Sequence, residues 1–233
     1  MSVVRARAPK MSREERAPAI LAAARKLLET RGLVGTSVAD VAAEANVSEA
    51  TVFNYFSTRH DLISRVITDW MSPVIERLEA DLAHMSDSGT CARLVFFASR
   101  HLGEMAAAPG MHQLIYREVH WDDYYLSTFH RLNQRYTRIV TRVIEEGKAA
   151  GEVRADVDVE VARDMFFGAF HHIGWRTLMN GRPLDTRATA DRIGNQLFSG
   201  IAAAAAATRG RASDLERAIA RLEQVTDRLD ARN

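Results

Sequence analysis

The sequence is short of the residues that build disulfide frameworks, sheets and membrane spans. Cys91 is its only cysteine, so one chain can form neither an internal disulfide nor a cysteine-based zinc cluster. Thirteen glycines and five prolines punctuate 233 residues, and few β-branched runs are bounded by turn residues, which leaves little room for sheets. No run approaches the roughly 18 consecutive apolar residues of a membrane span, and the first residues lack the apolar core of a signal peptide. We expect a cytoplasmic protein with no membrane partner.

What is present is the composition of a helical globular protein. Hydrophobic residues make up 47% of the chain and charged residues 26%, which is the balance of an ordinary folded domain. Apolar residues recur at helical spacing along most of the length. The sequence therefore predicts an all-α fold and, at roughly 100 to 200 residues per domain, one domain or two small ones.

Charge is unevenly distributed, although the net charge is only +1. Residues 1–60 hold nine Lys or Arg against six acidic residues, a local charge of +3. Residues 1–12 include Arg5, Arg7 and Lys10 without apolar periodicity, so we expect a basic flexible arm there. A basic N-terminal end suits a nucleic-acid partner, although an ordinary fluctuation in surface charge would give the same numbers.

The first predicted helix has an apolar stripe between Ile20 and Leu28 and ends before Gly32, a residue typical of helix C-termini. Ser12 and Glu15 have the spacing of a capping box. Pro18 opposes that start, because its ring clashes with the carbonyl group four residues back. We expect either a regular helix from about Ala17 or a distorted first turn.

Two shorter helices are predicted next. Ser37 and Asp40 have capping-box spacing, Asn46 suits a left-handed turn, and Ser48 is the predicted N-cap of the second short helix. Two short helices joined by a tight turn indicate a helix-turn-helix, whose second helix enters the major groove of DNA. Residues 13–62 are therefore the predicted DNA-binding domain.

A fourth, long helix is predicted to open at the cap formed by Thr58 and Asp61. Pro73 lies within it and predicts a kink or a break. The alternative is a helix that ends before Ser72, with Pro73 in the first turn of the next one.

The stretch GLVGTSVADVAAEANVSEATVFNYFSTRHDL, from Gly32 to Leu62, closely resembles the N-terminal DNA-binding domain of the TetR (tetracycline repressor) family. A weaker resemblance covers residues 145–158, which are similar to the join between the seventh and eighth helices of that family. Three residues depart from the usual pattern: Phe53 stands where Tyr is usual, Arg59 where Lys is usual and Asn46 where Gly is usual. Arg keeps the charge of Lys, whereas Phe53 lacks the hydroxyl that would bind a phosphate.

The resemblance implies a set of DNA-contacting residues. For contact with phosphates it implies Thr36, Ser37, Ser48, Thr51, Tyr55 and Arg59. For reading bases it implies Glu49, Ala50 and Asn54. These three suit that task, because Asn pairs with adenine, Glu accepts from cytosine N4 and an Ala methyl group touches a thymine methyl group. The alternative is that Glu49 and Asn54 are merely solvated on an exposed face.

The rest of the chain predicts five further helices, near residues 89–107, 110–121, 122–149, 158–180 and 186–208. We expect residues 63–208 to form an effector-binding and dimerisation domain, and residues 209–233 to form a helical C-terminal extension. Within that extension, Leu215, Leu222 and Leu229 have the spacing of a coiled-coil seam. We prefer the interpretation that this segment is a solvent-exposed terminal helix that packs on its own domain, because the repeat is too short to establish a coiled coil.

Twelve of the 17 aromatic residues fall between Phe96 and Trp175. Packing in the core explains any one of them, but together with nearby Met and His residues they have the composition of an apolar ligand pocket. The resemblance also implies an effector pocket, and we expect a small hydrophobic or aromatic effector. The candidate ligand-binding residues are Phe97, His101, Met105, Tyr116, Trp121, Tyr125, Phe129, Phe166, Phe170, His171 and Trp175.

The sequence thus predicts a ligand-responsive transcriptional regulator that binds double-stranded DNA. The resemblance implies a repressor that leaves a semi-palindromic operator when its effector binds, and a homodimer formed by helices 158–180 and 186–208. We expect no metal, no cofactor and no enzymatic activity, since no catalytic motif is present. The alternatives are a helical enzyme with an incidental helix-turn-helix and an effector-independent DNA-binding protein.

Overall fold

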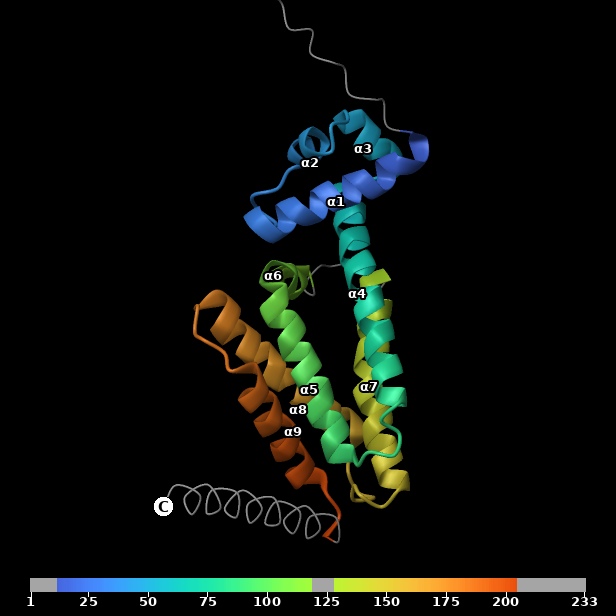
Figure 1. Cartoon of the computed structure of the whole chain (residues 1–233), viewed down its shortest axis with the longest axis vertical. Helices are drawn as coiled ribbons and strands as arrows, with labels where there is room; N and C mark the ends of the chain where they lie inside the picture. The colour runs from blue at the N-terminus through green and yellow to red at the C-terminus, as the bar shows by residue number, and fades with distance from the viewer. Residues whose placement is uncertain (1–11, 119–127, 205–233) are drawn as a thin grey trace, which may run out of the picture. The chain divides into compact units, whose positions relative to one another are not determined.

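The computed structural model describes residues 12–118 and 128–204. The remainder of the predicted basic arm, the C-terminal extension at 209–233, Trp121 and Tyr125 lie outside the described residues. Within them the all-α prediction is confirmed. The helices are α1 (Arg13–Arg31), α2 (Val38–Glu44), α3 (Glu49–Tyr55), α4 (Arg59–Ala83), α5 (Thr90–Ala107), α6 (Pro109–Glu118), α7 (Thr128–Ala149), α8 (Val159–Gly174) and α9 (Thr186–Ile201) (Figure 1).

Local capping sets most of the helix starts. The predicted box at Ser12 and Glu15 is formed in both directions, and α1 begins at Arg13 with Pro18 inside it. Of the two alternatives for this helix, a start near Ala17 is wrong, because the capping box satisfies N-H groups that the first turn would otherwise leave unpaired. Pro73 likewise lies inside α4, which runs on to Ala83. The alternative of a helix that ends before Ser72 is wrong too.

Two predicted helices end earlier than expected. Residues 158–180 form α8 only to Gly174, and a π-helical turn follows from Trp175 to Met179. The helix predicted to reach residue 208 stops at Ile201. Ala202 is extended and pairs with Val153, which follows α7, in an isolated antiparallel β-bridge.

Contacts around that bridge explain the end of α9. The backbone N-H of Arg154 donates to the Ile201 carbonyl at 2.9 Å, and its guanidinium donates to the Gly200 carbonyl at 2.8 Å. These two acceptors at the end of α9 are thus satisfied by a distant segment rather than by another helical turn.

The described chain divides into two compact units. The first holds the chain up to Arg77 and the stretch from Glu104 to Arg135, and the second holds Leu78–Gly103 and the chain from Tyr136 onward. This division by packing differs from the predicted domain boundary at residue 62, because α4, α5 and α7 each contribute to both units.

In the first unit, α1 packs against α2, α3 and α6. Its apolar stripe is buried, with Ile20 at 0% exposure and Leu28 at 2%, and Val41 of α2 and Val52 of α3 are also buried. In the second unit, α9 approaches α5 closely. A Cβ atom on Gly194 would lie 2.8 Å from the backbone N of Val95, so this crossing needs a residue without a side chain.

His112 of α6 is a buried histidine in the first unit, with 8% of its surface exposed. Its ring meets Trp70 of α4 edge-on, with ring centroids 5.1 Å apart. Burial lowers its pKa to about 4, and the hydrogen bond to the Ala108 carbonyl offsets only part of that effect. The side chain is therefore neutral in the folded protein near pH 7.

We expect this histidine to make folding sensitive to mild acid. The unfolded chain binds a proton at His112 near pH 6.5, but the folded chain binds it only near pH 4. The stability that the neutral side chain provides is complete above pH 6.5, is lost as the pH falls toward 4, and is reduced by about 2 kcal/mol at pH 5. Urea denaturation gives the free energy of unfolding at pH 7.5 and at pH 5.0. The decrease between these two pH values should be smaller by that amount in His112→Gln than in the wild type. Equal losses in the two proteins would contradict the expectation.

Candidate DNA-binding surface and aromatic core

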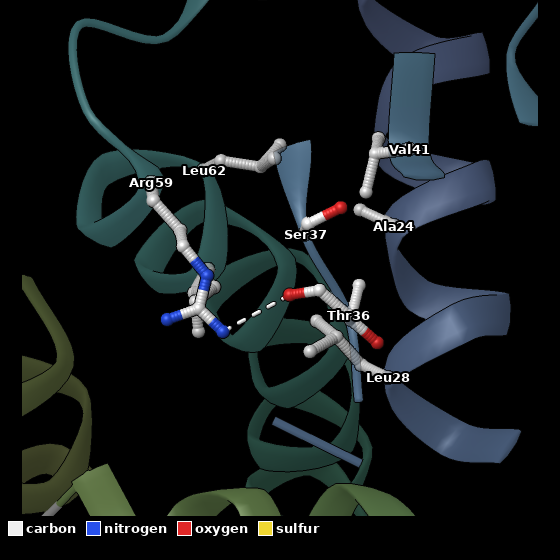
Figure 2. A pocket seen from close by; sticks show the side chains of 8 residues that line it. Ala24, Leu28, Thr36, Ser37, Val41, Arg59 and Leu62 are labelled. Carbon is white, nitrogen blue, oxygen red and sulfur yellow. Dashed lines mark hydrogen bonds between the residues drawn. The ribbon is translucent and has the colours of Figure 1, made fainter. Parts of the chain in front are cut away.

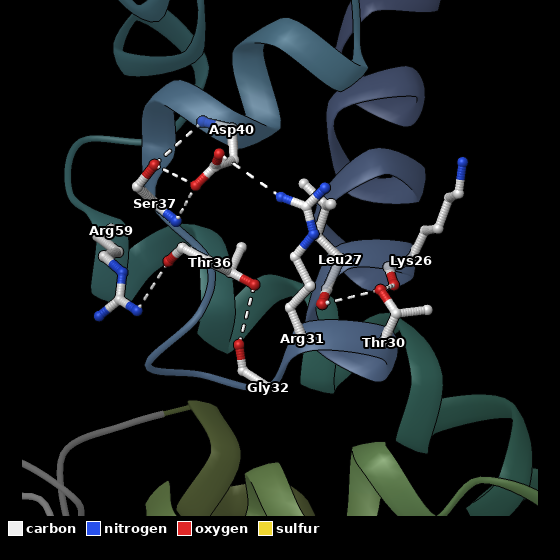
Figure 3. Close-up of polar contacts among 9 residues, drawn as sticks. All are labelled: Lys26, Leu27, Thr30, Arg31, Gly32, Thr36, Ser37, Asp40 and Arg59. Atoms are coloured by element: carbon white, nitrogen blue, oxygen red, sulfur yellow. Dashed lines mark hydrogen bonds and ion pairs between the residues drawn. The ribbon is translucent and has the colours of Figure 1, made fainter.

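The helix-turn-helix is held in shape by hydrogen bonds between residues close in sequence. The Ser37 hydroxyl accepts from the Asp40 backbone N-H, and the Asp40 carboxylate accepts from the Ser37 backbone N-H at 2.9 Å (Figure 3). Ser48 caps α3 by accepting from the Thr51 backbone N-H. Asn46 has a φ of 54°, the left-handed conformation expected of it in the turn. The predicted caps at Ser37 and Ser48 are confirmed.

Ion pairs tie α2 to α1. Arg31 lies 3.6 Å from the Asp40 carboxylate, and Lys26 lies 2.6 Å from the Glu44 carboxylate. Two hydrogen bonds from Ser37 hold the pKa of Asp40 below its usual value, and the bond from the Ser37 side chain has a larger effect than the bond from its backbone. A hydrogen bond from Lys26 does the same for the pKa of Glu44. Both carboxylates are therefore charged near neutral pH.

One face of α3 points inward and the other faces solvent. Val52 is 1% exposed and Phe56, just after the helix, is 7% exposed. Glu49, Ala50 and Asn54, the three candidate base readers, are all exposed. The structure thus brings these three residues onto one accessible surface, as base reading requires.

The hydroxyl groups that were predicted to contact phosphates form hydrogen bonds within the helix-turn-helix domain. We call this domain, residues 13–62, the head. Thr36 is buried, and its hydroxyl donates to the Gly32 carbonyl at 2.9 Å. The Tyr55 hydroxyl donates to the Arg13 carbonyl at 2.8 Å. The Ser48 and Thr51 hydroxyls lie 2.8 Å apart in a mutual hydrogen bond. In the free protein these groups shape the head, and their contact with phosphates stays a prediction.

Arg59 joins the start of α4 to the loop between α1 and α2. Its Nη2 atom donates to the Leu33 carbonyl at 2.5 Å. The same atom donates to the Thr36 carbonyl at 3.1 Å, as Figure 3 shows. The guanidinium also borders a small cavity of about 10 Å³ (Figure 2), roughly the room of one water molecule. A guanidinium has five N-H donors, so Arg59 can hold this loop and still present donors to a phosphate. The loop contact was not foreseen, because its partners are backbone atoms more than 20 residues away.

Two large apolar side chains of the head are exposed. Phe53 of α3 is 47% exposed, and Val34 in the loop before α2 is 88% exposed. The only prediction for Phe53 was that it lacks the hydroxyl group that would bind a phosphate. Its position three residues after Ala50 and four after Glu49 was the available signal that it shares their face.

Backbones of α6 and α1 nearly touch at Gly110. A Cβ atom at this position would lie 2.6 Å from the Glu29 carbonyl oxygen and 2.9 Å from the Glu29 Cα atom. Both residues belong to the first compact unit. Part of the segment predicted as the effector domain therefore packs directly on the helix that supports the helix-turn-helix.

Four of the candidate ligand-binding residues meet in the second unit. Phe97, Phe166 and Phe170 are at most 1% exposed, and the rings of His101 and Phe170 stack with centroids 4.3 Å apart. Tyr136, which was not among the candidates, joins the cluster through a hydrogen bond between its hydroxyl and His101 Nδ1, which are 2.7 Å apart. We call Phe97, His101, Tyr136, Phe166, Phe167 and Phe170 the aromatic cluster.

The remaining candidates are placed elsewhere. Met105, Tyr116 and Phe129 belong to the first unit, where burial raises the pKa of Tyr116 to about 12. His171 and Trp175 are exposed. Ligand contact by each of these residues stays a prediction.

Apolar side chains of α8 and the turn after it are exposed along one side. Val161 is 54% exposed, Met165 66% and Trp175 59%, and their spacing puts them within one helical face. Gly168 lies on the same face, and a Cβ atom there would meet nothing within 4 Å. We call Val161, Met165, Gly168, Trp175 and Met179 the α8 stripe.

Together, a capped helix-turn-helix with an exposed α3 surface and a second helical unit define a helix-turn-helix transcriptional regulator. Residues 20–66 match the model of the TetR family of bacterial regulatory proteins, and residues 67–200 match that of the C-terminal region of YsiA-like proteins. The chain belongs to the TetR family, as its resemblance predicted. Among the described residues no helix has the length and hydropathy needed to cross a membrane.

Individual relatives are similar over most of their length. The fatty acid metabolism regulator protein of Bacillus subtilis (strain 168) is 26% identical over 186 residues, which are 78% of this chain and 93% of the relative. The transcriptional repressor KstR2 of Rhodococcus jostii is 24% identical over 183 residues, 77% of this chain and 86% of the relative. The crystal structure of FadR from Bacillus subtilis with stearoyl-CoA has the same fold, with a TM-score of 0.70 at 24% identity over 79% of this chain and 98% of FadR.

Proposed function

We propose that this protein is a dimeric repressor that a hydrophobic small molecule releases from a semi-palindromic operator. The observation that carries the proposal is the α3 surface, which the caps, the ion pairs and Arg59 hold exposed and in a fixed orientation. A repressor among the relatives supports the direction of regulation. A DNA-binding protein acts where the DNA is, so we infer a cytoplasmic location. We also infer that it is a regulator without enzymatic activity, as its relatives are regulators.

Asn54 and Arg59 should have different effects on DNA binding. If Asn54 reads a base, Asn54→Ala should cost about 1 to 3 kcal/mol on the operator and relax preference at one position. Arg59→Ala should weaken all sequences alike, and it should also destabilise the head because two hydrogen bonds are lost. Arg59→Lys separates these effects, since it keeps the charge but not the forked donors. Fluorescence anisotropy on duplexes selected from a randomised pool, with thermal denaturation alongside, measures both.

The assignment of Asn54 has a direct counter-outcome. If Asn54→Ala weakens binding to the selected duplex and to random duplex by the same factor, Asn54 is solvated and does not read a base. If the wild type binds all duplexes equally, the proposed function itself is wrong.

The dimer is proposed from the α8 stripe. An exposed apolar face marks a site of protein association, and a second copy of the chain would cover the α8 stripe, on whose face the exposed His172 also lies. A two-fold dimer would also present two copies of α3 to two half-sites. The open positions at Gly168 and, on α9, Gly200 would let two backbones approach closely.

Met165→Glu should therefore convert the dimer to a monomer at micromolar concentration, because it would bury a charge in the interface. Val34→Glu is the matched control, since Val34 is also an exposed apolar residue but lies in the head. Sedimentation velocity should show a mass shift for the first variant only. If the mass of Met165→Glu equals that of the wild-type dimer, α8 is not part of the interface.

The effector is proposed to be an apolar molecule with a polar end. The aromatic cluster is a buried group of apolar rings with one polar pair, His101 and Tyr136, and apolar sites with few polar groups are typical of ligand pockets. A regulator of the same fold binds stearoyl-CoA, and a relative regulates fatty acid metabolism. We therefore infer a long-chain acyl thioester as the effector class.

Stearoyl-CoA should weaken binding of the full-length protein to the selected duplex, and coenzyme A alone should not. Tenfold release requires about 1.4 kcal/mol of coupling between the two sites. Tyr136→Phe removes only the hydroxyl, so it should reduce the response to stearoyl-CoA while leaving duplex affinity unchanged. An unaltered affinity at saturating stearoyl-CoA, together with native mass spectra that show no bound acyl-CoA, would reject this effector class.

A further inference from the structure

Phe53 lies at the centre of the α3 surface, yet it is outside the predicted set of DNA contacts. Single exposed apolar residues are common on proteins, so its 47% exposure alone carries no function. Its neighbours on the helix are what set it apart. At 100° per residue, Phe53 and Ala50 lie side by side between Glu49 and Asn54.

This arrangement forms an apolar strip flanked by two polar side chains. Val52 and Phe56 point into the core with at most 7% exposure, so they fix which way α3 is turned. The ring of Phe53 is thereby held on the outward side, and it contacts no phosphate through a hydrogen bond because it has no polar atom. It needs an apolar partner on the DNA.

The floor of the major groove offers one such partner among the four bases. Its base edges present hydrogen-bond donors and acceptors, and the one exposed apolar group is the C5-methyl of thymine. We propose that Phe53 is a specificity-determining residue that covers the C5-methyl group of a thymine in each operator half-site, next to Ala50. The inference rests on the proposed entry of α3 into the major groove.

The test removes that methyl group and nothing else. Duplexes selected by the full-length wild-type protein from a randomised pool are resynthesised with deoxyuridine in place of each thymine in turn. Removing a buried methyl group should weaken wild-type binding about fourfold at one position of each half-site. Substitution in both half-sites should weaken it about fifteenfold. Phe53→Ala should bind with reduced affinity and should discriminate between the thymine and deoxyuridine duplexes less than the wild type does, because only the methyl group of Ala50 then remains beside the thymine.

Val34→Ala is the matched control, because Val34 is the other exposed large apolar residue in the described part of the first unit. This variant should discriminate between thymine and deoxyuridine as the wild type does. Melting temperatures of both variants should match the wild type, since both side chains are exposed.

Three outcomes would overturn the inference. If the wild type selects a duplex but tolerates deoxyuridine at every position, no thymine methyl is read. If Phe53→Ala keeps the full discrimination, another residue reads the methyl group. If the wild type selects no duplex at all, the inference fails together with the proposed DNA-binding function, and that result is distinguishable from the first two.

Discussion

Burial of the apolar side of α1 is the constraint on which the head depends. Val41 of α2 and Val52 of α3 are buried in the same unit, so neither short helix can rotate without exposing apolar surface. Helices of seven residues are too short to be stable alone, and these two gain their order from α1. The direction in which α3 faces is thus a consequence of packing, and the exposed side chains at 49, 50, 53 and 54 follow from it.

Charged and polar contacts add orientation to this packing. Ion pairs on a surface contribute little stability each, but Lys26 with Glu44 and Arg31 with Asp40 restrict how α2 lies along α1. Arg59, at the start of α4, restrains the loop before α2 by donating hydrogen bonds to two of its backbone carbonyls. A displacement of the start of α4 would therefore reach the loop before α2 directly.

Sequence reasoning succeeded where the determining contacts are local. The caps at Ser12, Ser37 and Ser48 and the left-handed Asn46 are each set within about four residues, and the structure contains all of them. It failed where the determining contact is distant. The end of α9 depends on Arg154, nearly 50 residues earlier, and the role of Arg59 in the loop depends on carbonyl groups that have no side-chain signature. The clustering of aromatic residues in the sequence grouped Phe97 and Phe170 with Phe129. It could not predict that Phe129 packs in the other unit.

Gly110 has a consequence for the helix that supports the DNA-binding surface. Because α6 meets α1 through main-chain atoms at this point, no flexible side chain lies between them that could shift to make room. A substitution that adds a Cβ atom at position 110 would therefore push the two backbones apart. Since α1 also packs against α2 and α3, the strain of such a substitution would fall on the helix that holds both short helices in place.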